Sequence, residues 1–376
     1  MQEIPQIAPY SSDLVFREES LGEEAEKLLS WFKKEIDHHI LIFLKEKEGQ
    51  ANEISKEAAD LVKEVERFIL QGGKRVRPAF LYSGYIASGG MAHDAALYAS
   101  MCVEFLHTFA LMHDDIIDRS NTRRGALTTH KSFEGLFSKR RLLGNKVQFG
   151  LSAAILAGDL SYSFAEEILS TAPFPQERIK RARHVFDQMK FQVISGEYLD
   201  VLGGYRRSLS EEEILNILEY KTAKYTVERP LHLGATLAGA EVHILETFTA
   251  YAIPLGQAFQ LQDDIFGVFG DKEKMGKPID SDIREGKKTV LIAKAYEWAR
   301  PDQKKVLKKL VGASHANKEE INEVRDIIYK TGAYDYAVSL SHRLIEQAVK
   351  AAESAKLNER GKEYLLAAAD YLLNRV

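Results

Sequence analysis

Apolar residues recur at intervals of three and four along most of this chain, and that spacing places them on one face of an α-helix. Segment 23–48 illustrates the pattern, with apolar residues at Ala25, Leu28, Leu29, Phe32, Ile36, Ile40, Phe43 and Leu44. Alternation of apolar and polar residues between turns, which is typical of β-strands, is nearly absent. The sequence therefore predicts an all-α fold.

The same spacing delimits the individual helices. We expect them at 23–48, 53–70, 92–118, 150–171, 176–200, 211–219, 222–238, 241–267, 287–299, 318–330, 332–355 and 359–374. Gly49 and the pair Gly72-Gly73 are expected to end the first two helices, and Ser210 with Glu213 has the form of a capping box. We expect residues 1–20 to be an N-terminal extension and residues 21–376 to form one domain, with a basic loop inserted at about 132–149.

Composition argues against several classes of protein. The 376 residues carry a formal net charge of −4, whereas nucleic-acid binders carry a basic excess. No apolar run approaches the roughly 18 residues of a membrane-spanning helix, and the acidic N-terminus does not resemble a signal peptide. The only cysteine, Cys102, is expected to be a small core residue. These features favour a cytoplasmic protein with no transmembrane segment and no nucleic-acid partner.

Two pairs of adjacent aspartates, Asp114-Asp115 and Asp263-Asp264, are the only Asp-Asp dipeptides in the chain. Each pair follows a long apolar helical pattern. Asp118 lies four residues after Asp114 and three after Asp115, so these carboxylates share nearly one face of a helix. The two pairs are 149 positions apart, so they come from different helices that can face each other across a bundle.

Like charges at this spacing repel, and the carboxyl end of a helix is unfavourable for carboxylates. No lysine or arginine lies one turn upstream of Asp114, where Phe109, Ala110 and Leu111 are found. We therefore expect a bound cation. Mg²⁺ is the natural candidate, because it takes one or two carboxylates and completes its shell with water and phosphate oxygens. A solvated acidic helix end is the alternative, and two such clusters make it less favourable.

Basic residues flank the first acidic cluster on both sides. Lys74, Arg75 and Arg77 follow Gly72-Gly73, and Arg123-Arg124 precedes a further glycine. Backbone N–H groups near glycines, a lysine and forked guanidinium groups suit a phosphate. These groups could bind a second anion directly, although a single basic triplet is more often a solvated face.

Seven segments, in order, resemble the motifs of the trans-isoprenyl diphosphate synthase family, the polyprenyl synthetases similar to farnesyl and geranylgeranyl diphosphate synthases. They are GGKRVRP, Glu104 with His107, DDIID followed by RRG, AILAGD at 154–159, KTAKYT at 221–226, FQLQDD, and GKPIDSDIREGKKT. The resemblance covers about residues 70–290. It implies an isoprenoid synthase-like bundle of roughly ten to thirteen helices around a central cavity, usually in a homodimer.

The resemblance also implies a prenyltransferase that condenses isopentenyl diphosphate with an allylic diphosphate (dimethylallyl, geranyl or farnesyl). It would use about two or three Mg²⁺ ions, with Mn²⁺ as a substitute. The metal-binding residues implied are Asp114, Asp115, Asp118, Asp263 and Asp264. The residues implied for isopentenyl diphosphate are Lys74, Arg77, His107 and Arg124. Those implied for the allylic diphosphate or the developing cation are Arg123, Lys221, Thr222, Gln260 and Lys277. The five aspartates, Arg123 and Lys221 would be the catalytic set.

The physical demands of such a reaction agree with these residues. Departure of diphosphate is easier when fixed cations neutralise the charge growing on it. A carbocation must be shielded from water, and an apolar helical bundle provides that shielding.

Three features depart from the family pattern. Leu127 stands where proline is usual in the loop after Arg124. Gly267 stands where the second acidic motif often has a third aspartate, so either Asp271 compensates or the site uses two carboxylates. Segment 132–149 is longer than is typical, and we expect it to be a solvated loop rather than a flap or a membrane contact.

Product length is expected to depend on the residues beneath the first acidic cluster. Phe109 lies five residues before Asp114, or about 7.5 Å down the helix axis, and Ala110 beside it is small. One aromatic residue there resembles family members that make C15 to C20 products. We expect the C20 product, all-trans geranylgeranyl diphosphate, with Phe109 blocking further growth; ordinary core packing is the alternative role for Phe109.

Four other functions remain open at this point. They are a longer-chain polyprenyl diphosphate synthase, a terpene cyclase, a metal phosphohydrolase suggested by His113-Asp114, and a non-catalytic partner subunit. A cyclase binds one diphosphate and does not need Lys74, Arg77 and Arg124 together. The phosphohydrolase would leave the paired aspartates unexplained, and only Gly267 favours a non-catalytic subunit.

Overall fold

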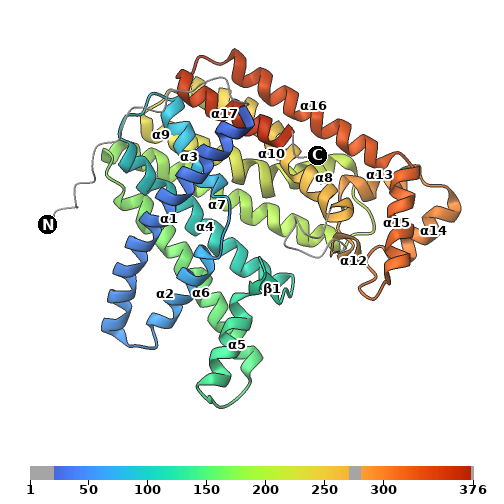
Figure 1. Ribbon diagram of the computed structural model, residues 1–376, viewed down its shortest axis with the longest axis horizontal. Coiled ribbons are helices and arrows are strands. Elements are labelled where there is room, and N and C mark those ends of the chain that lie inside the picture. The colour runs from blue at the N-terminus through green and yellow to red at the C-terminus, as the bar shows by residue number, and fades with distance from the viewer. Residues whose placement is uncertain (1–20, 271–280, 374–376) are drawn as a thin grey trace.

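The computed structural model describes residues 21–270 and 281–373, and nearly all of them are helical. The first half contains α1 (Leu21–Ile54), α2 (Ala59–Leu70), α3 (Val76–Ala87), α4 (His93–Ile117), α5 (Thr129–Lys139), α6 (Lys146–Thr171) and α7 (Gln176–Gly204). The second half contains α8 (Glu211–Leu218), the π-helix η1 (Glu219–Glu228), α9 (Arg229–Ala238), α10 (Val242–Phe269), α12 (Ser281–Glu285), α13 (Val290–Trp298), α14 (Pro301–Leu310), α15 (Lys318–Lys330), α16 (Ala333–Ser354) and α17 (Glu359–Leu373). The predicted all-α class is confirmed (Figure 1).

The helices are more numerous than the sequence predicted, because α3, α5, α12 and α14 were not expected. Helix α3 is buried on most sides, so it lacks the polar face that makes a helical period visible. The predicted end of α1 at Gly49 is wrong, since the helix continues to Ile54. The predicted capping box at Ser210 and Glu213 is confirmed, with each side chain bonded to the other's backbone.

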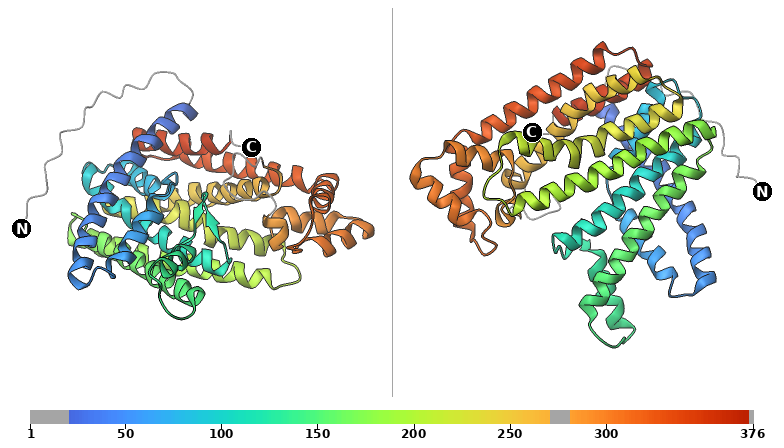
Figure 2. Two further views of the ribbon diagram at one scale, coloured as in Figure 1. Left: turned by 60° about the horizontal axis from the view of Figure 1, so that its bottom comes forward. Right: turned by 180° about the vertical axis from the view of Figure 1, so that it is seen from behind.

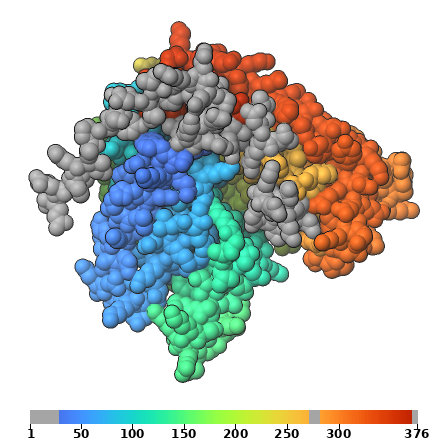
Figure 3. Space-filling view, in the orientation of Figure 1, coloured from blue at the N-terminus to red at the C-terminus, as the bar shows by residue number. Residues whose placement is uncertain are grey.

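The expectation of a loop at about 132–149 is wrong. Helix α5 occupies Thr129–Lys139 and α6 begins at Lys146, so only a short connection separates them. Phe133 is buried, and the Phe137 ring packs against Phe149 of α6 with centroids 5.5 Å apart. These aromatic residues give the segment an apolar face, which its many basic residues obscure in the sequence. Helix α5 lies at one end of the molecule, in green at the bottom of Figure 3.

The largest hydrophobic core lies among α1, α2, α4, α6 and α7, and the predicted burial of Cys102 there is confirmed. Helix α4 is the one described helix whose length and composition would allow it to cross a membrane. In that helix, 72% of the most apolar stretch of 18 residues is buried against the rest of the protein. A central core helix has this property, and one such helix is weak support for a membrane span.

The π-helix η1 is wedged between α7 and α10 at two glycines. A Cβ atom at Gly196 would lie 2.6 Å from the Lys221 backbone nitrogen, and one at Gly256 would lie 2.3 Å from Ala223 Cα. Only glycine permits these close approaches. They hold η1 between helices that carry acidic residues, and π-helical turns are frequent at functional sites.

Candidate active site

A short hairpin positions two arginines beside the first acidic cluster. Strand β1 (Thr122–Arg123) pairs antiparallel with β2 (Ala126–Leu127), and Arg123 lies opposite Ala126. The two turn residues, Arg124 and Gly125, have φ angles of 52° and 77°. Positive φ at both positions is typical of the tight hairpin turn that fits the twist of paired strands. Leu127, the position where proline is usual in the family, therefore lies in a strand.

Arg123 binds both aspartates of the first cluster. Its Nε donates to Asp115 Oδ1 at 2.8 Å, and its Nη2 donates to Asp114 Oδ2 at 2.9 Å. Asp115 is fully buried, whereas Asp118 is the exposed C-cap residue of α4. The hairpin that follows the helix therefore supplies a cation that offsets part of this charge. The expectation that Asp114, Asp115 and Asp118 bind a metal ion stays a prediction.

A third acidic pair, Glu197 and Asp200, lies on α7 and was missed by the sequence analysis. Lys221 Nζ contacts Glu197 at 3.0 Å and Asp200 at 2.5 Å. Burial would lower the pKa of Lys221, but Asp200, Glu197 and Asp114 raise it above its usual value. Burial raises the pKa of Glu197 and the charge of Asp114 adds to that effect, against the opposing influence of Lys221. The pair therefore belongs to the same electrostatic environment as the first acidic cluster.

The predicted residues Thr222, Gln260 and Asp264 form one hydrogen-bonded chain. Thr222 Oγ1 donates to Gln260 Oε1 at 3.0 Å, and Gln260 Nε2 donates to Asp264 Oδ1 at 3.0 Å. Asp264 is buried whereas Asp263 is half-buried. Burial raises the pKa of Asp264 to about 8, and the charges of Asp282 and Asp263 contribute to the increase. The second acidic cluster is thus held in place from η1, and its crowded carboxylates repel one another.

Asp282 of α12 occupies the space beside Gly267. A Cβ atom at Gly267 would lie 2.3 Å from Asp282 Oδ2, closer than real Cβ contacts allow. Asp282 is 8% exposed and pairs with Lys287 at 3.2 Å. A carboxylate from a different helix therefore lies where the side chain of residue 267 would begin. Asp271, the replacement considered from the sequence, lies outside the described residues.

The residues predicted to bind a second diphosphate gather around His107. Arg77 lies over the Tyr225 ring at 4.5 Å and donates to Thr226 Oγ1 at 2.9 Å. The Tyr225 hydroxyl lies 3.3 Å from His107 Nδ1. Burial lowers the pKa of His107 well below its usual value, and the nearby arginines lower it further. The imidazole is therefore neutral at pH 7 and can offer one N–H group.

Arg124 completes this basic cluster, and Arg75 does not. Arg124 donates to the Gly72 carbonyl oxygen, so the hairpin touches the glycine pair. Burial lowers the pKa of Arg124, and the positive charges of Arg75, Arg123 and Arg77 also lower it. Arg75 is buried and binds Asp37 at 2.7 Å and Glu104 at 2.6 Å, so its charge is compensated within the protein.

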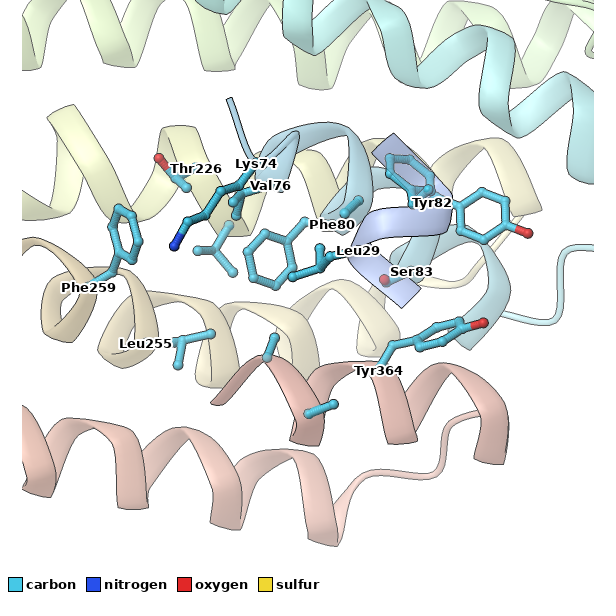
Figure 4. Close-up of a pocket in the computed structure, with 15 residues that line it drawn as sticks. Leu29, Lys74, Val76, Phe80, Tyr82, Ser83, Thr226, Leu255, Phe259 and Tyr364 are labelled. Atoms are coloured by element: carbon cyan, nitrogen blue, oxygen red, sulfur yellow. The ribbon is translucent and has the colours of Figure 1, made fainter. Parts of the chain in front are cut away.

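Lys74 borders an apolar cavity of about 80 Å³ between α1, α3, η1, α10 and α17. Figure 4 shows Lys74, Thr226 and Phe259 at one end and Tyr364 at the other. An engineered cavity that binds benzene measures about 150 Å³. This cavity is therefore too small for a C15 or C20 chain, which must extend elsewhere.

Phe109 lies beneath the first acidic cluster against two aromatic rings. Its centroid is 5.1 Å from Tyr162 of α6 and 4.7 Å from His113. Ala110 beside it is half-buried. Three aromatic side chains thus pack together where α4 meets α6.

The structure brings many of the predicted site residues together in three groups. It brings Asp114, Asp115 and Arg123 into one cluster, Thr222, Gln260 and Asp264 into a second, and Arg77 and His107 into a third. The predicted residue Lys277 lies outside the described residues. The residues that sequence reasoning missed are Glu197, Asp200, Tyr225 and Asp282. Glu197 and Asp200 do show a signal, an acidic pair three residues apart like Asp115 and Asp118.

Comparison with known proteins gives consistent results. The family model described as polyprenyl synthetase matches residues 59–328. A geranylgeranyl diphosphate synthase of Sulfolobus acidocaldarius is 37% identical over 280 residues, which are 74% of this chain and 79% of that protein. A geranylfarnesyl diphosphate synthase of Aeropyrum pernix is 31% identical over 346 residues, covering 91% and 99%. The crystal structure of a geranylgeranyl pyrophosphate synthase from Corynebacterium glutamicum, complexed with isoprenyl diphosphate and magnesium, is 34% identical with a TM-score of 0.87, covering 92% of this chain and 99% of that one.

Proposed function

The chain belongs to the polyprenyl synthetase family of trans-isoprenyl diphosphate synthases, and from that premise we propose that it condenses isopentenyl diphosphate with an allylic diphosphate to give all-trans geranylgeranyl diphosphate. Family members are prenyl-transferring enzymes that use a divalent metal. The C20 product is supported by the relatives named geranylgeranyl diphosphate synthase. It is also supported by the aromatic group around Phe109.

The observation that carries this proposal is the basic cluster around His107, which adjoins the first acidic cluster, since Arg123 binds Asp114 and Asp115 and also lowers the pKa of His107. Arg77 and Arg124 crowd like charges there, and such crowding is relieved by an anion. Two diphosphates would account for both the acidic and the basic groups. One would be held through metal ions, and the other by Lys74, Arg77, His107 and Arg124. A terpene cyclase, which binds a single diphosphate, would leave the second cluster without a role.

The carboxylates suit a hard divalent cation. The oxygens of Asp114 and Asp115 already converge on one cationic group, the Arg123 guanidinium. In the described part of the chain, no three His, Cys, Asp or Glu side chains form a metal site by themselves. Mg²⁺ commonly binds through one or two carboxylates and completes its shell with substrate phosphates and water. We propose that Asp114, Asp115, Asp118, Asp263 and Asp264 bind about two or three Mg²⁺ ions together with the diphosphate, and that Asp282 supplies the carboxylate that Gly267 lacks.

The surrounding residues would prepare the reaction. When bound, the metal ions would neutralise the charge that grows on the departing diphosphate. Arg123 and Lys221 add fixed positive charge at the same place, and Thr222 and Gln260 orient Asp264. The basic cluster orients isopentenyl diphosphate so that its double bond faces the allylic carbon. The apolar helices exclude water from the carbocation.

Measuring product formation with purified protein tests this function. Isopentenyl diphosphate and Mg²⁺ are supplied with dimethylallyl, geranyl or farnesyl diphosphate, and the products are sized by chromatography. We expect a C20 product that depends strictly on both substrates and on the metal. Product from the allylic diphosphate alone would support a cyclase, phosphate release from nucleotides a phosphohydrolase, and no product from folded protein a non-catalytic subunit.

Replacing Phe109 by alanine is expected to lengthen the product. The substitution removes the ring that packs on Tyr162 beneath Asp114, so the growing chain can extend by further five-carbon units. Chromatography of the products at equal substrate conversion measures the change. An unchanged product profile would show that Phe109 does not block the chain, and would leave the condensation reaction itself unaffected.

We propose that the enzyme is a cytoplasmic homodimer, joined through α6 and α7. These helices lie side by side in the right-hand view of Figure 2. They expose apolar side chains at Leu156, Phe191, Ile194 and Tyr198, with 56%, 73%, 51% and 64% of their surfaces accessible. An exposed apolar patch of this kind commonly marks an interface.

Replacing Phe191 by aspartate is expected to convert the dimer to a monomer in sedimentation experiments. A charge placed in an apolar interface must lose its hydration. Met91, which is 81% exposed in another part of the molecule, provides the matched control, and Met91→Asp should leave the dimer intact. A Phe191→Asp protein that remains dimeric would exclude this face as the interface.

A further inference from the structure

Helix α7 carries a buried lysine on the same face as the active-site acids Glu197 and Asp200. Residues 190, 193, 197 and 200 are spaced by three and four, so Lys190 shares that face. It lies seven residues before Glu197, or about 10.5 Å further along the helix. Lys190 is 8% exposed, so its ammonium group is placed inside the fold about two turns below the acidic site.

The charge of Lys190 is held by two carboxylates. Its Nζ contacts Glu166 of α6, and it lies 2.7 Å from Asp187 Oδ1. Burial alone would lower the pKa of Lys190, but the hydrogen bonds to Asp187 and Glu166 raise it above its usual value. The side chain is therefore an ammonium ion at every pH at which the enzyme would work.

A continuous series of ring contacts connects this ammonium to the residue beneath the first acidic cluster. Lys190 Nζ lies 5.5 Å from the Tyr162 centroid and 4.8 Å from the Phe186 centroid. Tyr162 in turn packs against Phe109 at 5.1 Å. Helix α6, which carries Tyr162, contacts both α4 and α7. Lys190 is thus connected to Phe109 through a single ring, that of Tyr162.

We propose that Lys190 is a second, charged stop that limits the length of the prenyl chain once the aromatic layer has been passed. The inference rests on the proposed prenyl-transfer function. The Lys190 side chain is 10% exposed, whereas its partners Glu166 and Asp187 are 30% and 65% exposed. A hydrocarbon chain end cannot solvate the ammonium ion, so further growth would require Lys190 to leave these partners and move out of its place. The aromatic layer would set the normal product, and Lys190 would set the longest product available when that layer is opened.

The test compares product lengths in the Phe109→Ala background. Phe109→Ala alone is expected to add one or a few five-carbon units. Adding Lys190→Met together with Glu166→Gln, so that the half-buried Glu166 carboxylate does not lose its partner, should move the main product at least one further five-carbon unit. Lys190→Arg in the same background keeps the charge and should keep the Phe109→Ala product. Lys190→Met alone should leave the wild-type product unchanged, because Phe109 still blocks the chain.

Lys294 provides a matched control for the loss of an ion-paired lysine. It pairs with Glu211 at 2.7 Å and lies 5.1 Å from the Tyr336 centroid, with an exposed fraction of its side chain close to that of Lys190. Phe109→Ala with Lys294→Met should give the Phe109→Ala product. If this control lengthens the product equally, or if the Lys190 and Glu166 variant does not lengthen it, the proposal is wrong. Circular dichroism establishes that each variant is folded.

Should the methionine variant fail to fold, Lys190→Gln in the Phe109→Ala background removes the charge and keeps hydrogen-bonding groups. It is expected to lengthen the product, and an unchanged profile would overturn the proposal. A failure of the underlying function is distinguishable, because the wild-type protein would then form no product from the two diphosphates. A failure of the proposal alone leaves turnover intact and the product lengths unaltered.

Discussion

Replacing Asp115 by asparagine is expected to lower kcat for condensation by about 10³-fold, which corresponds to about 4 kcal/mol of transition-state stabilisation. Asp115 is fully buried, and its carboxylate shares Arg123 with Asp114. Asparagine keeps the shape and can still accept a hydrogen bond from Arg123, so the hairpin should keep its place. What it removes is one negative charge from the group that would bind the metal and, through it, the leaving diphosphate.

Two measurements distinguish this effect from general damage. Calorimetry with a bisphosphonate mimic should show that Mg²⁺-dependent binding is lost in Asp115→Asn, while the thermal midpoint stays close to that of the wild type. Asp60, which pairs with Arg140 at 2.7 Å and is partly buried, is the control. Asp60→Asn should retain kcat. Wild-type kcat and normal Mg²⁺-dependent binding in Asp115→Asn would remove Asp115 from the metal-binding set.

The sequence was sufficient for the fold class and for the positions of most helices, because amphipathic faces repeat visibly along the chain. It failed where that signal is absent. Helix α3 is buried on most sides and shows no polar face, and α5 carries so many basic residues that its aromatic face was not recognised. Burial from all directions and a charged exterior have the same consequence, since each hides the period on which the prediction depends.

The candidate site was predictable where residues are close in sequence and not where helices meet. Asp114 and Asp115 are adjacent, and the hairpin that brings Arg123 to them begins a few residues later. Glu197 and Asp200 lie on α7, and their place beside Lys221 depends on how η1 packs at Gly196. Such a contact depends on the rotation of one helix against another, which no spacing within a single segment specifies.

Asp282 is the clearest example, because its position explains an apparent defect in the sequence. Gly267 lacks the third aspartate of the family motif, and it lies three residues after Asp264 on the same helix. The space beside it holds the Asp282 carboxylate. The glycine and the aspartate therefore depend on each other, since a side chain at 267 and the present position of Asp282 exclude one another.

Replacing Gly267 by alanine is accordingly expected to destabilise the protein. In an unobstructed helix interior the same change stabilises by about 0.5–1 kcal/mol. Here the new Cβ would lie 2.3 Å from Asp282 Oδ2, and overpacking of this kind costs about 1–3 kcal/mol. The cost of overpacking exceeds the gain from the better helix former, so the free energy of unfolding should fall in denaturant titration. Adding Asp282→Gly should restore it, whereas a Gly267→Ala protein more stable than wild type would show that Asp282 moves freely.

The two positions also allow the carboxylate to be moved from one helix to the other. Asp282→Gly alone should weaken Mg²⁺-dependent binding of a bisphosphonate and lower kcat by about 10- to 100-fold, the usual size of effect for groups that support a metal site. Gly267→Asp alone should do no better, because the new side chain meets Asp282 and adds another buried like charge. The double variant places one carboxylate on α10, as the family motif has it, and should recover at least tenfold of the lost binding.

Recovery in the double variant would separate a need for charge at this location from a need for Asp282 itself. If the double variant binds as weakly as Asp282→Gly while its thermal midpoint is restored, Asp282 serves the packing of α12 and its pairing with Lys287 rather than the metal.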